Sequence, residues 1–194
     1  GHGISVVGVR YGYRGLIEGD FKGLERADVL NIQREGGTIL GSARCPEFHE
    51  RSYRDVARRR LKDARVDQVL VIGGNGSLAG AQALGALDEQ LKDWPLSVLG
   101  LSASIDNDVG CTSLSIGVDT AMNTIVEACD RIADTATAHD RTFIVEVMGR
   151  DCGYLAMTAG IGAGADRVLF REAGLPLEEV VERVAQTVQT AHAR

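Results

Sequence analysis

The stretch that decides the fold is LSASIDNDVGCTSLS, residues 101–115. It continues the apolar run at 96–101, and a short apolar run that enters a polar loop predicts a buried strand ending in a site. In open parallel sheets, ligands bind beyond the carboxyl ends of the strands. Asp106 and Asp108 can have different roles there: one can accept a proton, and the other can bind a metal or contribute to the electrostatic potential of the site. Taken alone, the D-N-D sequence fits an Asx-rich turn equally well.

The segments on either side of this stretch alternate between strand and helix patterns. The run at 68–72, QVLVI, is apolar and β-branched, as expected of a strand buried on both faces. Further strands are predicted at 4–9, 38–40, 142–147 and 165–170, and helices at 50–65, 78–87, 119–138, 152–161 and 176–191. This alternation predicts an α/β fold with a mostly parallel sheet and helices on both faces, in three layers.

Composition and charge narrow the function classes. The chain has 194 residues, and 21 basic against 27 acidic residues give a net charge of -6, which argues against nucleic acid or an anionic membrane as the main partner. No apolar run reaches the about 20 residues that span a bilayer. The four cysteines show no zinc-ligand or disulfide spacing, so we expect free thiols and a cytoplasmic location. Arg58, Arg59 and Arg60 are expected to lie on a solvated helix face.

A glycine-rich turn, GGNGS at residues 73–77, lies between the strand predicted at 68–72 and the helix that follows it. Glycines let the main chain approach a phosphate closely, and a helix N-terminus offers unpaired N–H groups with a positive dipole. A turn of this kind binds a phosphate about as often as it serves only as a tight turn. The turn is therefore a candidate phosphate site.

Several motifs together resemble the 6-phosphofructokinase family. They are GGNGS (73–77), SIDND (104–108) and VEVMGRDCGYLA (145–156), with GGTILGSAR (36–44), IGVDTAMNTIVEACDRIADTATAHDRTF (116–143) and AGADRVLF (163–170) around them. The likeness extends over nearly the whole chain from Ile4 onward. It implies phosphoryl transfer from ATP, with Mg²⁺, to the 1-hydroxyl of fructose 6-phosphate. It also implies a phosphofructokinase-like fold and a homo-oligomer, either a dimer or a tetramer.

The resemblance assigns roles to individual residues. Asp106 is the implied general base, Ser104 stands where the family usually has threonine, and Arg44 bridges the donor phosphates. Arg141 would reach the substrate of a neighbouring subunit. Asp108 would hold the metal, and Asn75 is a weaker metal candidate because its amide is neutral. The implied ATP-binding residues are Arg44, Cys45, Gly74, Asn75, Gly76 and Ser77, and the implied sugar-binding residues are Ser104, Ile105, Asp106, Asp108, Arg141, Met148, Gly149 and Arg150.

Asn75 departs from the family pattern, and two further positions, Gly76 and Ala103, indicate which phosphoryl donor is used. Asn75 stands where the family usually has aspartate, so we expect weaker binding of the metal–nucleotide complex and reduced activity. Pyrophosphate-dependent relatives typically have an aspartate at the position of Gly76 and a lysine at that of Ala103. The residues present here favour ATP as the donor.

The match to the family is expected to be partial. We expect an incomplete domain region that lacks the family's N-terminal glycine-rich loop and its C-terminal part and is inactive alone. Residues 1–120 would form mainly the nucleotide side, and 121–194 the start of the sugar-phosphate side. The alternatives are an impaired or regulatory subunit, a pyrophosphate-dependent enzyme, a kinase of the wider group acting on a dinucleotide or a lipid, and a dinucleotide-binding module.

Overall fold

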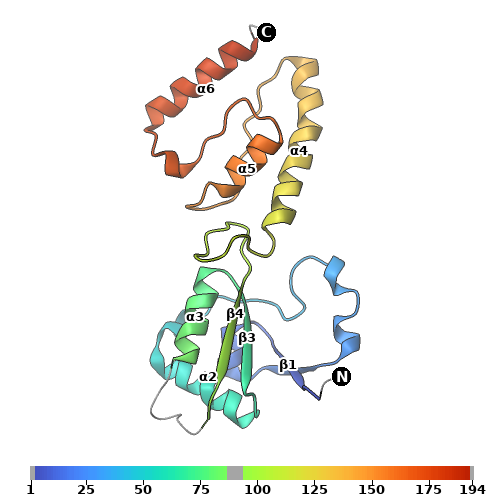
Figure 1. Cartoon of the computed structure of the whole chain (residues 1–194), viewed down its shortest axis with the longest axis vertical. Coiled ribbons are helices and arrows are strands. Elements are labelled where there is room, and N and C mark those ends of the chain that lie inside the picture. The colour runs from blue at the N-terminus through green and yellow to red at the C-terminus, as the bar shows by residue number, and fades with distance from the viewer. Residues whose placement is uncertain (1–2, 87–93, 193–194) are drawn as a thin grey trace. The chain divides into compact units, whose positions relative to one another are not determined.

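The computed structural model describes residues 3–86 and 94–192 (Figure 1). Two compact units are present, the first made of Gly1–Val71 and Gly76–Leu101 and the second of Ile72–Asn75 and Ser102–Arg194. Leu87, the expected last residue of the helix at 78–87, lies outside the described residues. Within the described ranges, no helix has the length and apolar character needed to cross a bilayer.

The first unit opens with two short antiparallel strands. β1 (Val6–Val9) pairs with β2 (Phe21–Leu24), and α1 (Tyr13–Glu18) lies between them in sequence. The strand predicted at 4–9 is confirmed for its last four residues. The sequence does not predict β2, because FKGL is too short and too mixed to show a period of two.

A second pair of strands leads to the candidate site. β3 (Gln68–Gly73) lies beside β4 (Ser97–Ser102), close to the bounds predicted for both. The Ser97 N–H donates to the Asp67 carbonyl at 2.9 Å, and the Ala103 N–H donates to the Gly73 carbonyl at 2.9 Å. Since both chains advance together between these bonds, the strands are parallel and their carboxyl ends lie side by side.

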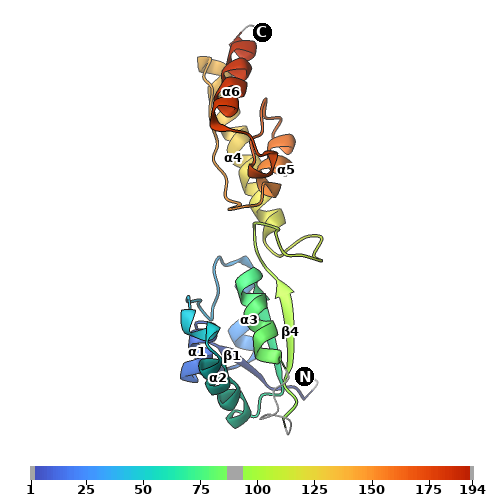
Figure 2. The ribbon, with the colours of Figure 1, turned by 90° about the vertical axis from the view of Figure 1, so that its left-hand side faces the viewer.

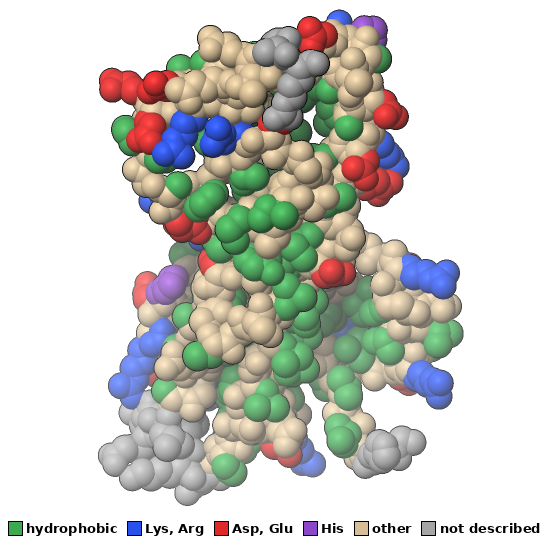
Figure 3. Space-filling view, turned by 45° about the horizontal axis from the view of Figure 1, so that its top comes forward, with side chains coloured by type: hydrophobic (Ala, Val, Ile, Leu, Met, Phe, Trp, Pro, Cys, Tyr) green, Lys and Arg blue, Asp and Glu red, His purple; other side chains and the backbone are tan. Residues whose placement is uncertain are grey.

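α3 (Asn75–Gly85) covers one face of this pair, beside β4 in Figures 1 and 2. A Cβ at Gly100 would lie 2.7 Å from Leu78, and one at Gly85 would lie 3.2 Å from Val98, so the two elements pack closely where the glycines lie. The opposite face is exposed at Leu70, Ile72, Leu99 and Leu101, and Figure 3 shows hydrophobic side chains at the surface. Val69 packs against the core cluster of the first unit, whereas Leu70 and Ile72 on the other face are exposed. The expectation that the strand at 68–72 is buried on both faces is therefore wrong.

The core of the first unit lies between its helices. α2 (Arg51–Asp63) packs on α1 and on the 3-10 helix η3 (Pro46–His49). The buried cluster consists of Leu16, Phe48, Ala57, Leu61 and Leu84. Arg59 and Arg60 are exposed as predicted, but Arg58 is only 5% exposed, so the expected solvated face is wrong for this residue.

The strand predicted at 38–40 is absent from the described structure. Two further 3-10 helices, η1 (Arg26–Val29) and η2 (Ile32–Arg34), precede it, and the segment itself forms a turn. The Gly41 N–H donates to the Thr38 carbonyl at 3.1 Å, and the Thr38 hydroxyl accepts from the Leu40 N–H at 3.2 Å. Local side-chain bonding of this kind competes with a strand ladder, which explains the wrong prediction.

The second unit consists mainly of helices after the loop that follows β4. α4 (Val118–His139) packs on α5 (Tyr154–Gly162), and α6 (Leu177–His192) follows the short 3-10 helix η5 (Arg171–Ala173). The helices predicted at 119–138, 152–161 and 176–191 are confirmed within two residues at each end. The regular recurrence of apolar residues over several turns makes such helices recognisable.

The strands predicted at 142–147 and 165–170 are not formed in the described structure. Both sequences have the β-branched, apolar composition of a strand, yet a strand also requires a hydrogen-bonded neighbour. Phe143, Ile144 and Val145 remain exposed, Ile144 to 83%. The α/β class is nevertheless confirmed, because helices alternate with strands and β3 and β4 pair in parallel.

Candidate active site

The glycine-rich turn passes directly from β3 into α3. The helix begins at Asn75, three residues before the predicted start at Leu78. The N–H groups of Gly76 and Ser77 therefore belong to the first helical turn, where backbone donors have no acceptor within the helix. A turn of this kind can bind an anionic group through its free N–H groups and its positive dipole.

Gly74 brings this turn close to the end of β4. A Cβ at Gly74 would lie 3.4 Å from the Cβ of Ser104 and 3.7 Å from its hydroxyl oxygen. The neighbouring backbone bond from Ala103 to Gly73 holds the two chains at this separation. The sequence-predicted residues Gly74 and Ser104 are thus brought together.

The loop that carries the two candidate carboxylates is held by Asn107. This residue has a positive φ of 53°, a conformation that asparagine tolerates better than most residues. Its Oδ1 accepts from the Ser115 N–H at 2.9 Å, and its Nδ2 donates to the Ser113 carbonyl at 3.3 Å. Asn107 therefore closes the loop between the two aspartates and the segment before α4.

Ser104 and Ser115 hold the other side of the loop. The Ser104 hydroxyl oxygen accepts from the Asp106 N–H at 3.3 Å. The Ser115 hydroxyl oxygen accepts from the Ser104 N–H at 2.9 Å, and Ser115 is only 2% exposed. Asp106 is half-buried in this arrangement and Asp108 is exposed. Sequence reasoning missed Asn107 and Ser115 as positioning residues, although a D-N-D sequence before a serine-rich segment signals local Asx bonding.

Asn75 joins the two loops. Its Nδ2 donates to the backbone carbonyl of Asp108 at 3.4 Å. A carboxylate at position 75 could not donate this bond. Asn75 and Asp108, both proposed for the metal from sequence, are therefore neighbours in the second unit.

The oxygen ligands in these loops suit a metal ion that takes few protein ligands and is bound mainly by water and substrate phosphates. Among the described residues, no group of three or more His, Cys, Asp or Glu side chains is placed to hold a metal ion. Mg²⁺ usually takes one or two protein carboxylates and fills its remaining positions with water and substrate phosphates. The carboxylates of Asp106 and Asp108 fit that pattern.

Arg44 and Cys45 lie in the first unit, just before η3. Arg44 is exposed, and its carbonyl accepts from Nη2 of Arg14 at 3.2 Å. Burial raises the pKa of the Cys45 thiol above its ordinary value, and the neighbouring carboxylate of Glu47 acts in the same direction. The Cys45 side chain is therefore a neutral thiol at physiological pH.

Tyr13 connects this segment to the first turn of α3. Its ring stacks on Phe48 of η3 with centroids 4.0 Å apart, and its hydroxyl donates to the Ser77 carbonyl at 2.5 Å. Burial raises the pKa of Tyr13 to about 12, so the phenol keeps its proton and remains a donor. A Cβ at Gly80 would lie 2.6 Å from the Tyr13 ring. Sequence reasoning missed this contact because it joins residues 64 positions apart.

The remaining candidates lie between α4 and α5 in sequence. Arg141 is exposed and follows the C-terminus of α4 directly. Gly149 and Arg150 lie in a turn that the bond from the Cys152 N–H to the Gly149 carbonyl closes at 2.8 Å, and the exposed Met148 directly precedes it. Arg150 has a positive φ of 50°.

Glu172 fixes the end of that turn at the N-terminus of α5. Its Oε1 accepts from the Gly153 N–H at 2.7 Å, and this bond lowers the pKa of the Glu172 carboxyl. A Cβ at Gly153 would lie 2.4 Å from that of Phe170, so the position requires glycine.

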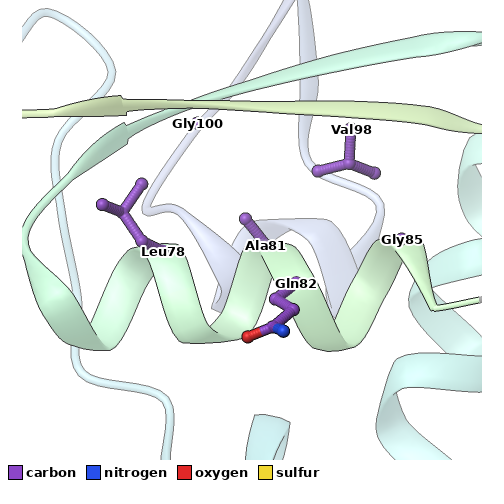
Figure 4. Close-up of a pocket in the computed structure, with 6 residues that line it drawn as sticks. All are labelled: Leu78, Ala81, Gln82, Gly85, Val98 and Gly100. Atoms are coloured by element: carbon purple, nitrogen blue, oxygen red, sulfur yellow. The ribbon is translucent and has the colours of Figure 1, made fainter. Parts of the chain in front are cut away.

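A cavity of about 350 Å³ lies between α3 and β4. Figure 4 shows the side chains of Leu78, Ala81 and Val98 on its walls, with Gln82 further along the helix. Gly85 and Gly100 complete the lining. None of the sequence-predicted site residues lines this cavity, so it is separate from the candidate site.

The comparisons with known proteins identify the class of this chain. Its whole length, residues 1–194, matches the family model described as Phosphofructokinase. The chain therefore belongs to the phosphofructokinase family, which confirms the resemblance read from the sequence.

Curated relatives give a more specific likeness. The chain is 44% identical over 183 residues to the ATP-dependent 6-phosphofructokinase of Halothermothrix orenii, covering 94% of this chain and 53% of the relative. It is 43% identical over 185 residues to the protein of the same name from Thermotoga petrophila, covering 95% and 56%. The chain thus spans about half the length of the curated relatives it matches.

Solved structures confirm the predicted phosphofructokinase-like fold. Phosphofructokinase from Saccharomyces cerevisiae matches with a TM-score of 0.77 and 38% identity, over 84% of this chain and 24% of that one. A pyrophosphate-dependent phosphofructokinase from Marinobacter aquaeolei matches with a TM-score of 0.79 over 97% of this chain and 50% of that one. Because the second is only 22% identical, it supports the fold alone.

Proposed function

We propose that this chain supplies part of the active site of an ATP-dependent 6-phosphofructokinase, which transfers a phosphoryl group from ATP to the 1-hydroxyl of fructose 6-phosphate. The observation that carries the proposal is the junction of two loops after paired parallel strands. A Cβ at Gly74 would lie 3.4 Å from that of Ser104, and the Asn75 amide donates to the Asp108 backbone carbonyl. The glycine-rich turn thus adjoins the loop that carries Asp106 and Asp108, which supports phosphoryl transfer, a reaction that depends on positioning and charge stabilisation.

In this proposal Asp106 is the general base that accepts the proton of the sugar hydroxyl. Its half-buried position and the bonds around Ser104 and Asn107 hold the backbone of the loop in a defined geometry. Positioning matters because phosphoryl transfer gains its rate mainly from alignment and charge stabilisation. Ser104 places a hydroxyl beside the transferred group.

We assign the nucleotide to the turn before α3 and to Arg44 and Cys45. Gly76 and Ser77 would bind phosphate oxygens through their free N–H groups, and Arg44 would neutralise the donor phosphates. Asp108 would hold Mg²⁺, with Asn75 as a neutral neighbour. When bound, Mg²⁺ would neutralise charge that develops on the phosphates.

We assign the sugar phosphate to the second unit. Met148, Gly149 and Arg150 would line its pocket together with Ile105 and Asp108. Arg141, exposed after α4, would bind the 6-phosphate in a neighbouring subunit, because its guanidinium can pair with phosphate through two parallel bonds. This role makes a homo-oligomer, a dimer or a tetramer, part of the proposal, as is a cytoplasmic location. Residues 1–120 serve mainly the nucleotide and 121–194 begin the sugar side.

ATP is the proposed donor because Gly76 leaves room beside the phosphates and Ala103 offers no cation for pyrophosphate. The names of the relatives at 43–44% identity support the same choice. A coupled assay of fructose 1,6-bisphosphate formation with ATP or pyrophosphate tests it. Turnover with pyrophosphate alone would overturn the donor assignment.

A second candidate function is a catalytically impaired or regulatory subunit that binds nucleotide or sugar phosphate. Asn75 favours it, because the amide adds no negative charge for Mg²⁺ and is already bonded to Asp108. Isothermal calorimetry with ATP and fructose 6-phosphate, with and without Mg²⁺, separates binding from turnover. Binding without turnover in a complete, folded enzyme would favour the regulatory function.

A further inference from the structure

Arg58 on α2 is buried, and its guanidinium is directed at the end of α3. Nε donates to the Leu84 carbonyl at 3.0 Å, and Nη2 donates to the carbonyls of Ala83 and Ala86 at 3.0 and 2.9 Å. Nη1 lies 3.4 Å from Oδ1 of Asp55, one helical turn earlier. The side chain is only 6% exposed.

These contacts suit the chemistry of both partners. The last carbonyls of a helix have no donor within the helix and carry the negative end of its dipole. A buried guanidinium, in turn, needs acceptors for its donors, because an unpaired buried charge is strongly unfavourable. Arg58 therefore ties the C-terminus of α3 to α2 at several carbonyls, and Gly85 packs this end against Val98 of β4.

The other end of the same helix is the glycine-rich turn. α3 has 11 residues, so a rigid helix of about 16 Å separates the guanidinium contacts from Asn75. A shift of the C-terminal end along the axis is transmitted to Gly76 and Ser77, because the hydrogen-bonded helix does not stretch.

We propose that Arg58 is a positioning residue for the nucleotide site, which it serves by fixing where the first turn of α3 lies. The identity of the ligand rests on the proposed function, whereas the placement of the turn does not. The hydrogen bonds of Arg58 to the Ala83, Leu84 and Ala86 carbonyls link it to the nucleotide site through α3.

The test compares three variants of the 194-residue chain. Arg58→Met keeps the length and apolar stem but removes all donors, and Arg58→Lys keeps the charge but loses the planar fork. Arg59→Met is the matched control, because Arg59 is the exposed neighbour on the same helix. Amide hydrogen exchange at residues 78–80, the first amides of α3 with acceptors inside the helix, reports the order of its N-terminal end, and calorimetry measures ATP and fructose 6-phosphate binding separately.

Arg58→Met is expected to speed exchange at residues 78–80 and to weaken ATP binding by about tenfold, because the N–H groups of the first turn would no longer be held in place for the phosphates. The affinity for fructose 6-phosphate should stay within about twofold of that of the unchanged chain, whereas a general loss of structure would weaken the binding of both ligands. The exchange rates and ATP affinity of Arg58→Lys should lie between those of Arg58→Met and the unchanged chain. Arg59→Met should have the same exchange rates and ATP affinity as the unchanged chain.

Unchanged exchange at residues 78–80 in folded Arg58→Met would overturn the inference. If Arg58→Met does not fold, Arg58→Lys decides, and unchanged exchange together with unchanged ATP binding in that variant would overturn it. If the unchanged chain binds no ATP, the proposed function fails in this chain, and the exchange result alone decides the role of Arg58.

Discussion

The Asn75 amide donates to the Asp108 backbone carbonyl across 3.4 Å, and this bond joins the turn after β3 to the loop after β4. The two segments are 33 residues apart in sequence. Parallel pairing of β3 and β4 brings their carboxyl ends to one edge, which is where ligands bind in sheets of this kind.

Asn75→Asp should strengthen Mg²⁺-dependent ATP binding by about tenfold, since an added carboxylate is a better ligand for a hard cation. The lost bond to Asp108 is long and exposed, so its removal costs about 0.5 kcal/mol. The gain should vanish when Mg²⁺ is removed. Asn75→Ala, which loses both the bond and the oxygen ligand, is the control, and calorimetry is the measurement. Equal affinities for Asn75→Asp and the unchanged chain would contradict the metal assignment.

Asn107→Ala should destabilise the loop by about 1–3 kcal/mol, because it removes two side-chain bonds and leaves alanine at a positive φ. Denaturant unfolding measures the change. Asn107→Gly is the control, since glycine adopts this φ freely and loses only the two bonds. If Asn107→Ala and Asn107→Gly were equally stable, the backbone conformation would contribute nothing.

The NMR chemical shift of the Gly153 amide should depend on pH, because this N–H donates to the Glu172 carboxylate. The pKa of Glu172 is lowered from its ordinary value of 4.5, chiefly by the bond from the Gly153 N–H. A carboxyl whose pKa falls on folding adds stability that is fully present above pH 4.5 and is lost as the pH falls through the folded pKa. NMR should show the Gly153 amide shift titrating below pH 4.5, and Glu172→Gln should abolish this titration. A midpoint above 4.5 would contradict the assignment.

The cysteines should differ in their reaction with iodoacetamide. Burial raises the pKa of Cys45, so little of it is thiolate at pH 8, whereas Cys111 is exposed. We expect Cys45 to react roughly tenfold more slowly than Cys111, since the thiolate is the nucleophile. Peptide mass spectrometry after timed labelling gives both rates, and faster labelling at Cys45 would contradict the burial argument.

The sequence predicts the long helices and the two central strands well, because their apolar residues recur with a clear period. It fails at 142–147 and 165–170, where the composition favours a strand but the described structure offers no partner for the backbone. It also fails at Arg58, because a charged side chain is buried only when acceptors from a distant segment meet it.

In the candidate site, too, some features can be predicted from the sequence and others depend on contacts between distant segments. GGNGS and SIDND point to their chemistry from sequence alone, and the resemblance assigns Asp106 its role. Contacts such as those from Asn75 to Asp108 and from Tyr13 to Ser77 join segments far apart in the chain, so they become visible only in the fold.

The central claim is that Asp106 is the base in ATP-dependent phosphorylation of fructose 6-phosphate. The most direct measurement is the turnover of a chimera in which this chain replaces the matched part of the Thermotoga petrophila relative, a match of 185 residues. We expect ATP-dependent turnover, absent from the 194-residue chain alone, that falls by about a hundredfold or more on Asp106→Asn. Undiminished turnover of the Asp106→Asn chimera would contradict the claim.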